Sequence, residues 1–229
     1  VTLVRAYMKF LRQVQLPYSL RYLEETLTNY SELTRSFVDL FELRFSLIPS
    51  KAKDSELSKL LKDIQSLLEK VDRLDHDRIF RRFLNAIEAT VRTNYFQMTP
   101  EQSLRRDYLK PYLSFKFDCR KLDDLPHPSP LYEIFVFSPR VEASHLRGAK
   151  VARGGIRWSD RPEDYRTEIL GLMKAQTVKN AVIVPLGSKG GFVVKKRDNF
   201  PDSHQLMEEV VCCYQMMMRG MLDITDNLV

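Results

Sequence analysis

Apolar residues recur at helical spacing from the start of the chain to about residue 105. Between residues 57 and 71 the spacing is nearly heptad, which is typical of a long exposed helix packed along one seam. The step from Leu16 to Ser19 predicts the end of one helix and the cap of the next. We therefore predict an all-helical region with apolar stripes at Leu3, Tyr7, Phe10, Leu11 and Val14; Leu33, Phe37, Val38, Leu40 and Phe41; Leu57, Leu60, Leu61, Ile64, Leu67, Leu68 and Val71; and Phe80, Phe83, Leu84, Ile87 and Val91.

This helical region has no group of residues with the character of a functional site. His76 lies between Asp75 and Asp77, where a solvent-exposed residue at a helix start is far more common than a ligand. We interpret residues 1–106 as a scaffold or linker that contributes to assembly.

From Pro111 onward the pattern changes to that of strands. Residues 112–117 alternate with period two, residues 132–137 are almost continuously apolar, and residues 141–146 form a third predicted strand. Three prolines between residues 123 and 130 cannot donate to a strand ladder, so a loop is predicted there.

Helical and strand patterns alternate in the rest of the chain. A helix is predicted after Arg157, with Ser159 or Asp160 as its cap and Pro162 in its first turn. The elements predicted after it are a buried strand at 181–184, a tight loop at 187–191, a strand at 192–194 and an amphipathic helix at 203–222. The predicted fold class is mixed α+β, an all-helical region (1–106) followed by an α/β substrate-binding region (107–229).

The charge pattern, hydropathy and cysteine content limit which classes of function the chain could have. The net charge is +6, but Lys and Arg alternate with Asp and Glu as on solvated helix faces, and no nucleic-acid-binding motif accompanies them. No apolar stretch approaches the roughly 20 residues that a membrane helix needs. Three cysteines, two of them adjacent, do not form a disulfide framework, so we expect a cytoplasmic protein without nucleic-acid or membrane partners and without a metal site.

The candidate chemistry is concentrated in residues 151–157, 176–180 and 185–191. Five of the chain's eight glycines lie in the first and last of these segments, each beside a cation. We expect two loops there, because glycine permits positive φ and lets a ligand approach the main chain. Gln176 and Lys179 are three residues apart on a predicted helix and project to the same side.

Arg153, Lys179 and Lys189, if they converge on one cavity, would bind a doubly charged anion. Their mutual repulsion would favour the neutral form of one lysine, which could then act as a base or activate a carbonyl. The segment 187–191 resembles a phosphate loop, but it lacks the G-x-x-x-x-G-K-[ST] order and precedes a strand. A tight turn with a solvated charge is the structural alternative for each loop taken alone.

Three motifs carry a resemblance to a known family: Arg-Gly-Gly-Ile-Arg-Trp at 153–158, Lys-Ala-Gln-Thr-Val-Lys-Asn at 174–180 and Pro-Leu-Gly-Ser-Lys-Gly-Gly-Phe at 185–192. Together they resemble the glutamate dehydrogenase superfamily, and most closely its large NAD-dependent class found mainly in bacteria. The similarity extends to 111–116 and 138–142, and into the predicted helices at 7–25 and 78–95.

The resemblance implies a role for each candidate residue. Lys189 would be the catalytic lysine that activates water and stabilises the carbinolamine. Gln176 and Lys179 would hold the α-carboxylate of glutamate, and Arg153, followed by Gly154 and Gly155, would meet the side-chain carboxylate. The smaller glutamate dehydrogenases carry lysine at the position of Arg153, and arginine can hold a carboxylate with two parallel bonds.

The resemblance also implies the reaction: NAD-dependent deamination of L-glutamate to 2-oxoglutarate and ammonia, in a homo-oligomer. The chain starts at Val1 without Met and has no G-x-G-x-x-G motif. We therefore expect an internal segment, inactive alone, with the NAD-binding domain and the catalytic aspartate beyond Val229. Two alternatives stay open: an assembly or regulatory scaffold with an anion-binding site, and an anion-binding module unrelated to amino acids.

Overall fold

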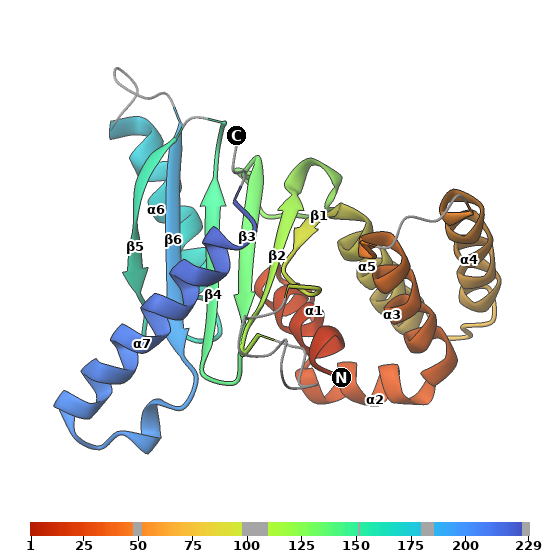
Figure 1. Ribbon diagram of the computed structural model, residues 1–229, viewed down its shortest axis with the longest axis horizontal. Coiled ribbons are helices and arrows are strands. Elements are labelled where there is room, and N and C mark those ends of the chain that lie inside the picture. The colour runs from red at the N-terminus through yellow and green to blue at the C-terminus, as the bar shows by residue number, and fades with distance from the viewer. Residues whose placement is uncertain (48–51, 98–109, 151, 180–185, 226–229) are drawn as a thin grey trace. The chain divides into compact units, whose positions relative to one another are not determined.

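Figure 1 shows the fold in a computed structural model that describes residues 1–47, 52–97, 110–150, 152–179 and 186–225. The chain divides into two compact units, Val1–Ala89 and Thr90–Val229. The boundary predicted at residue 106 falls in 98–109, outside the described residues. The predicted mixed α+β class, helices first and then a sheet with helices, is confirmed.

The first unit contains five helices in its described residues: α1 (Thr2–Gln13), α2 (Leu20–Asn29), α3 (Ser31–Phe45), α4 (Lys53–Leu68) and α5 (Leu74–Ala89). The predicted cap is present, since the Tyr22 amide donates to the Ser19 hydroxyl over 3.2 Å. The predicted stripes supply the core, in which Tyr7 packs edge-on against Phe41 and Phe37 stacks with Phe83.

His76 is not the solvent-exposed residue that the sequence suggested. It lies in the first turn of α5 and keeps only 7% of its surface exposed. Its ring packs against the rings of Tyr22 and Tyr30, at centroid distances of 5.8 and 5.5 Å. Flanking aspartates therefore do not place a residue in solvent when its own side chain points to an aromatic cluster.

The helical region also ends earlier than predicted. Residues Thr90–Thr93 form strand β1, which pairs antiparallel with β2 (Leu113–Asp118), so Val91 belongs to a strand and not to the last helical stripe. Threonine and valine favour strands, and a partner strand about 20 residues further along the chain decides the conformation.

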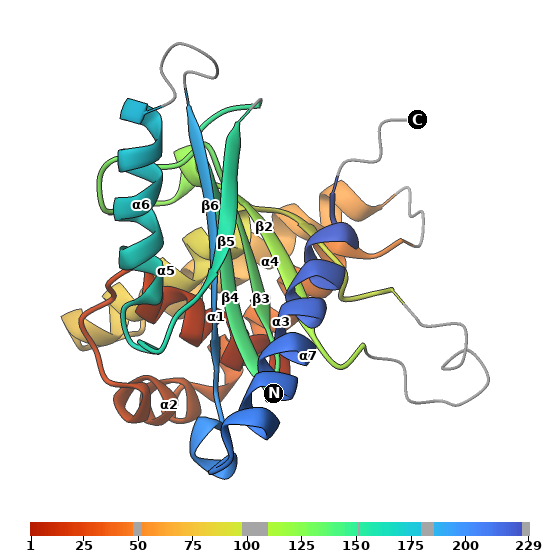
Figure 2. The same ribbon diagram turned by 90° about the vertical axis from the view of Figure 1, so that its left-hand side faces the viewer.

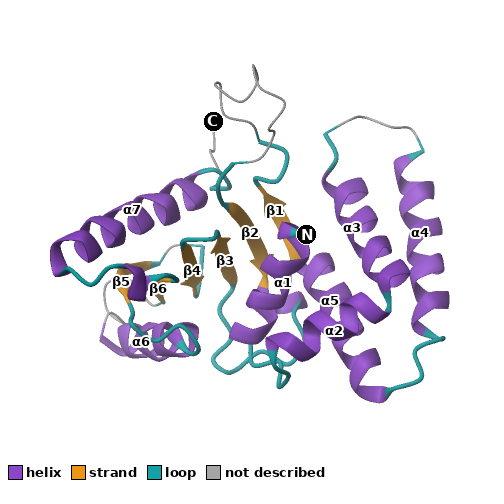
Figure 3. Cartoon of the chain, turned by 90° about the horizontal axis from the view of Figure 1, so that it is seen from below, coloured by secondary structure: helices purple, strands orange, loops and turns teal. Residues whose placement is uncertain are grey.

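A six-stranded mixed sheet with the order β1-β2-β3-β4-β6-β5 forms the second unit. Strands β3 (Tyr132–Phe137) and β4 (Val141–Arg147) confirm two predictions, and the prolines between β2 and β3 lie outside any strand. Helix α6 (Tyr165–Lys179) covers one face of the sheet and α7 (Ser203–Leu222) the other (Figure 2 and Figure 3). Among the strands that the structure describes, only β5 (Arg153–Trp158) and β6 (Gly187–Val194) are parallel, and α6 lies between them in a βαβ unit.

Two predicted loops are strands. Gly187–Gly191 belongs to β6, which runs without interruption to Val194, and Arg153–Gly155 begins β5. Helix α6 begins at Tyr165, so Ser159, Asp160 and Pro162 precede it and do not cap it. The strand predicted at 181–184 lies outside the described residues.

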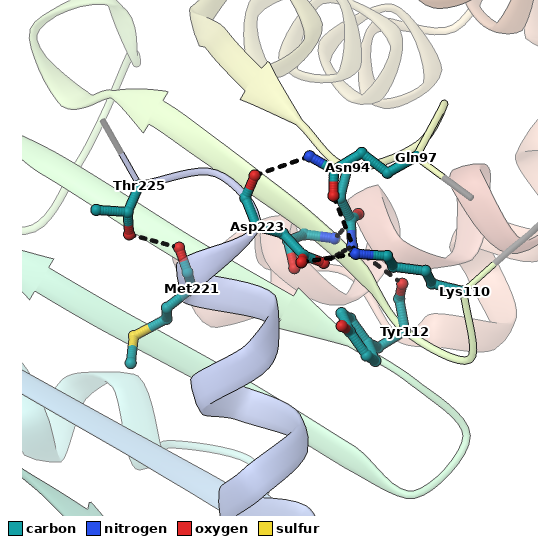
Figure 4. A network of polar contacts seen from close by, with 8 residues as sticks. Asn94, Gln97, Lys110, Tyr112, Met221, Asp223 and Thr225 are labelled. Atoms are coloured by element: carbon teal, nitrogen blue, oxygen red, sulfur yellow. Dashed lines mark hydrogen bonds and ion pairs between the residues drawn. The ribbon is translucent and has the colours of Figure 1, made fainter. Parts of the chain in front are cut away.

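A polar network around Asp223 attaches the C-terminal end of α7 to residues that follow β1 and precede β2 (Figure 4). One carboxylate oxygen of Asp223 pairs with Lys110 Nζ at 2.6 Å and the other accepts from Asn94 Nδ2 at 3.0 Å. Gln97 Nε2 donates to the Asp223 carbonyl over 2.8 Å. Burial and the neighbouring Asp223 raise the pKa of Tyr112 to about 12, so its hydroxyl stays protonated.

Candidate functional site

The two Gly-containing motifs lie side by side in the sheet. Strands β5 and β6 pair in parallel register, which places Arg153 opposite Gly187, Gly154 opposite Ser188 and Gly155 opposite Lys189. Two segments more than 30 residues apart in sequence therefore form one ribbon at the edge of the sheet, where β5 is the last strand.

The candidate side chains share the face of the sheet that α6 covers. Gly187 and Gly191 lie against Gln176 and Ile169 of α6, so alternation along β6 places Lys189 on that face too. On β5, Arg157 pairs with Glu168 of α6, and alternation places Arg153 and Gly155 on the same side. Ile156 and Trp158 point to the opposite face, toward the α7 cluster.

The glycines serve close packing and not unusual backbone conformation. No described glycine has positive φ, contrary to the expectation from sequence. A Cβ at Gly154 would lie 1.5 Å from the Ser188 carbonyl oxygen, and one at Gly187 would lie 2.9 Å from the Met173 carbonyl oxygen. Gly154 thus permits the approach of β5 to β6, and Gly187 permits the approach of α6 to β6.

Gly155 has different surroundings. A Cβ there would meet a single atom within 4 Å, the Nζ of Lys189 at 3.9 Å. The amine of the half-buried Lys189 therefore lies beside the bare, exposed backbone of Gly155. Within the described residues nothing else lies within 4 Å of that Cβ position, so a small molecule there could touch both the Gly155 main chain and Lys189.

Helix α6 brings Gln176 to the same end of the site. Gln176 is half-buried, and its Cβ and Cγ would lie 3.0 and 3.2 Å from a Cβ at Gly187, the residue paired with Arg153. The structure thus brings together Arg153, Gly155, Gln176 and Lys189. Lys179 is the last residue of α6, and its side chain lies outside the part of the structure that is described.

Glu168 is a participant that the sequence did not single out. Its side chain is 19% exposed; one carboxylate oxygen pairs with Arg157 Nε at 2.8 Å and the other accepts from the Ser159 hydroxyl at 2.8 Å. An acid in the first turn of a helix is common, so its position alone gave no signal. The clue available in the sequence was the second arginine of the Arg-Gly-Gly-Ile-Arg motif, a cation that can pair with an acid on the following helix.

Other reactive groups of the second unit do not join this site. Burial raises the pKa of Cys119, and burial together with Glu209 raises the pKa of Cys213 to about 12, so both remain thiols. His145 lies on the α7 face of the sheet beside Gly190, where burial and then Arg147 lower its pKa. Among the described residues, no group of three or more His, Cys, Asp and Glu could hold a metal ion.

The arrangement suits recognition of an anion next to an amine. Arg153 and Gln176 lie at one end of the ribbon, and Lys189 is two residues further along β6 from Gly187. At about 3.3 Å per residue, this places the backbone of Lys189 roughly 7 Å from that end. A cation, an amide and a lysine so spaced can bind the carboxylate and the reacting carbon of a small amino acid.

Comparison with known proteins relates both units of the chain to glutamate dehydrogenases. The profile for the bacterial NAD-glutamate dehydrogenase catalytic domain matches residues 63–229, and that for glutamate dehydrogenase helical motif 3 matches residues 1–47. NAD-specific glutamate dehydrogenases from Halomonas elongata and Mycobacterium tuberculosis are each 48% identical over 229 and 234 residues. The corresponding protein of Pseudomonas aeruginosa is 47% identical over 231 residues.

These alignments cover 100% of the present chain but 14% of each relative, so the chain spans about one seventh of their length. The matches include the β5–α6–β6 unit that carries the candidate site. Within the described residues, none of the helices is both long and apolar enough to cross a bilayer.

Proposed function

Because this chain belongs to the bacterial NAD-glutamate dehydrogenase family, we propose that it forms the substrate-binding segment of an enzyme that deaminates L-glutamate. The full-length enzyme would produce 2-oxoglutarate and ammonia and reduce NAD, as a cytoplasmic homo-oligomer. One observation carries the assignment to this segment: parallel pairing of β5 and β6 brings the Arg-Gly-Gly and Lys-Gly-Gly motifs into one ribbon next to Gln176.

Each candidate residue has a proposed task. Arg153 binds the side-chain carboxylate of glutamate, while Gln176 and Lys179 bind the α-carboxylate. These contacts hold the α-carbon beside Lys189. Lys189 in its neutral form takes a proton from the water that attacks the imine carbon, and in its charged form it stabilises the carbinolamine oxygen. Gly155 keeps the backbone beside the substrate free of a side chain, while Gly154 lets β5 lie close to β6.

The described residues do not fit a dinucleotide. Dinucleotide sites place glycines between a strand and the N-terminus of the following helix, so that the helix meets the pyrophosphate. Here the glycines of the candidate site lie inside β5 and β6, and α6 begins seven residues after β5 ends. We therefore propose that NAD, which supplies hydride acceptance when bound, is held mainly by polypeptide outside this chain.

The catalytic role of Lys189 is tested in the full-length enzyme. Lys189→Ala should remove nearly all glutamate-dependent NAD reduction and leave the melting temperature close to that of the wild type, because the side chain is only half-buried. The exposed Lys196→Ala is the matched control and should keep wild-type turnover. Retention of more than a few per cent of activity by Lys189→Ala would show that another group is the base.

The substrate assignment is tested with two amino acids that differ in one carboxylate. Replacing Arg153 by Met should lower kcat/KM for glutamate at least about tenfold relative to norvaline, since the lost contact is to the distal carboxylate only. Equal losses for both substrates would make Arg153 structural. Binding of simple dianions, with no preference for glutamate or 2-oxoglutarate, would instead favour an anion-binding module unrelated to amino acids.

A further inference from the structure

Helix α6 and strand β5 both carry residues of the proposed site, so their relative position sets its geometry. Arg153 lies near the start of β5 and Gln176 near the end of α6. A shift of α6 along the sheet would move Gln176 away from Arg153 while leaving both elements folded. The buried pair of Arg166 with Glu133 on β3 holds α6 against the middle of the sheet. The position of α6 relative to the edge strand β5 depends on contacts between these two elements.

One ion pair links the two elements directly. Arg157 Nε of β5 and the Glu168 carboxylate of α6 are 2.8 Å apart, and the Ser159 hydroxyl, just after β5, donates to the other oxygen of Glu168 over 2.8 Å. Glu168 thus accepts from two points of the β5 end simultaneously. A carboxylate held from two sides resists both sliding and rotation of the helix.

The ion pair lies at about the same distance from the proposed site along β5 as along α6. Arg153 precedes Arg157 by four residues, which is about 13 Å along a strand at 3.3 Å per residue. Gln176 follows Glu168 by eight residues, which is about 12 Å along a helix at 1.5 Å per residue. Near the link, a Cβ on Gly191 would lie 2.6 Å from Ile169, and near the site one on Gly187 would lie 3.0 Å from Gln176, so α6 follows β6 over this whole length.

We propose that Glu168 is a positioning residue: by accepting from Arg157 and Ser159 it sets the register of α6 on β5, and through it the spacing between Arg153 and Gln176. It does not touch the substrate. This inference rests on the proposed function, because its consequence is substrate selectivity. Loss of the Glu168 charge should let α6 shift and weaken the simultaneous grip on the two carboxylates of glutamate.

The chain provides a matched control on the other face of the sheet. Glu209 of α7 accepts from Arg140 Nε over 2.9 Å and from the Cys213 thiol over 3.5 Å. It is 9% exposed and its arginine 46%, against 19% and 58% for Glu168 and Arg157. Both carboxylates attach a helix to the end of a strand, but only α6 carries proposed site residues.

The test is a double-mutant cycle in the full-length enzyme, read as the ratio of kcat/KM for glutamate to that for norvaline. Glu168→Gln should lower this ratio at least about threefold, the size of coupling seen within one network. In the Arg153→Met background the same change should leave the ratio unaltered, because the distal contact is already lost. Glu209→Gln should leave the ratio unaltered in both backgrounds. Glu168→Asp keeps a carboxylate that can restore part of the contact, so it should lower the ratio less than Glu168→Gln does.

Equal loss for both substrates after Glu168→Gln, or the same change of ratio in both backgrounds, would overturn the positioning role and leave a structural one. A change of ratio in Glu209→Gln as large as in Glu168→Gln would overturn it too. A failure of the proposed function would be visible without any Glu168 variant. In that case the wild-type and Arg153→Met enzymes would not distinguish glutamate from norvaline.

Discussion

At the scale of single residues, the neighbours Gly154 and Gly155 make different demands on the protein. A methyl group at Gly154 would meet the Ser188 backbone at 1.5 Å, whereas among the described residues one at Gly155 would meet only Lys189 Nζ at 3.9 Å. Gly154→Ala should therefore cost stability, about 1–3 kcal/mol or more as in overpacked cores. Gly155→Ala should fold normally and lower turnover, because its methyl group occupies the space beside the amine.

Thermal unfolding and kcat/KM of the two variants in the full-length enzyme check this pair. The expected pattern is a lower melting temperature for Gly154→Ala, and a nearly unchanged one with reduced kcat/KM for Gly155→Ala. Unchanged kcat/KM in Gly155→Ala would mean that substrate does not approach the amine from that side.

His145 predicts a pH dependence of stability. Burial, and then Arg147, lower its pKa in the folded chain, so between the folded and the unfolded pKa the unfolded state binds more protons. Stability is therefore fully present above the unfolded value of about 6.5 and is lost as pH falls from there toward the folded value. The melting temperature of the chain should fall between pH 7.5 and 5, and less so in His145→Asn. An equal fall in both proteins would assign the effect to other groups.

The sequence pointed to candidates with distinctive chemistry, whose roles stay predictions, and it did not reveal contacts between residues far apart in the chain. The candidates Arg153, Gln176 and Lys189 were identified from charge, glycine content and family resemblance, and the structure places them on one face. Glu168 was missed because an acid early in a helix has many ordinary explanations. His76 was misjudged because its burial depends on Tyr22 and Tyr30, about 50 residues away.

At the scale of elements, α6 is also attached to the middle of the sheet by a buried ion pair. Arg166 Nε and Nη2 donate to both oxygens of Glu133 on β3, over 2.6 to 3.0 Å, and both side chains are 0% exposed. Removing one partner leaves a buried charge without compensation, so Glu133→Gln or Arg166→Met should each cost about 3–5 kcal/mol.

Urea unfolding of the chain measures this cost. The double variant Glu133→Leu with Arg166→Met should recover much of the loss, since two apolar side chains leave no buried charge. Single variants within about 1 kcal/mol of wild type would contradict the expectation and would place the pair in a more hydrated setting than its exposure indicates.

Elements with a clear periodic pattern were predictable from sequence, whereas a short strand and a glycine-containing strand were not. The pattern predicted 132–137 as a strand and 203–222 as a helix, and both limits are confirmed. Strand β1 was missed because four residues after a helix carry no periodic signal, and their pairing with β2 is a long-range contact. Glycines in β6 suggested a loop, but there they make room for α6 and for the neighbouring side chains.

At the scale of the whole molecule, the two units have different proposed roles, because all of the proposed site residues lie in one of them. The helical unit, Val1–Ala89, has an aromatic core, and its residues 1–47 match a helical motif of glutamate dehydrogenases. The second unit carries every proposed site residue, on β5, β6 and α6. The sequence predicted a change from helices to strands, and in the structure the pairing of β1 with β2 places Thr90 at the start of the sheet unit.

The largest consequence is that this chain should bind substrate without turning it over. The proposed carboxylate and lysine contacts lie within it, whereas hydride transfer needs a dinucleotide positioned against the α-carbon, and its described glycines do not form such a site. The purified chain should show no glutamate-dependent NAD reduction. Its binding of 2-oxoglutarate, followed by calorimetry, should be weakened by Arg153→Met and unaffected by Glu209→Gln. Measurable NAD reduction by the purified wild-type chain, absent in Lys189→Ala, would show that the dinucleotide binds to these residues after all.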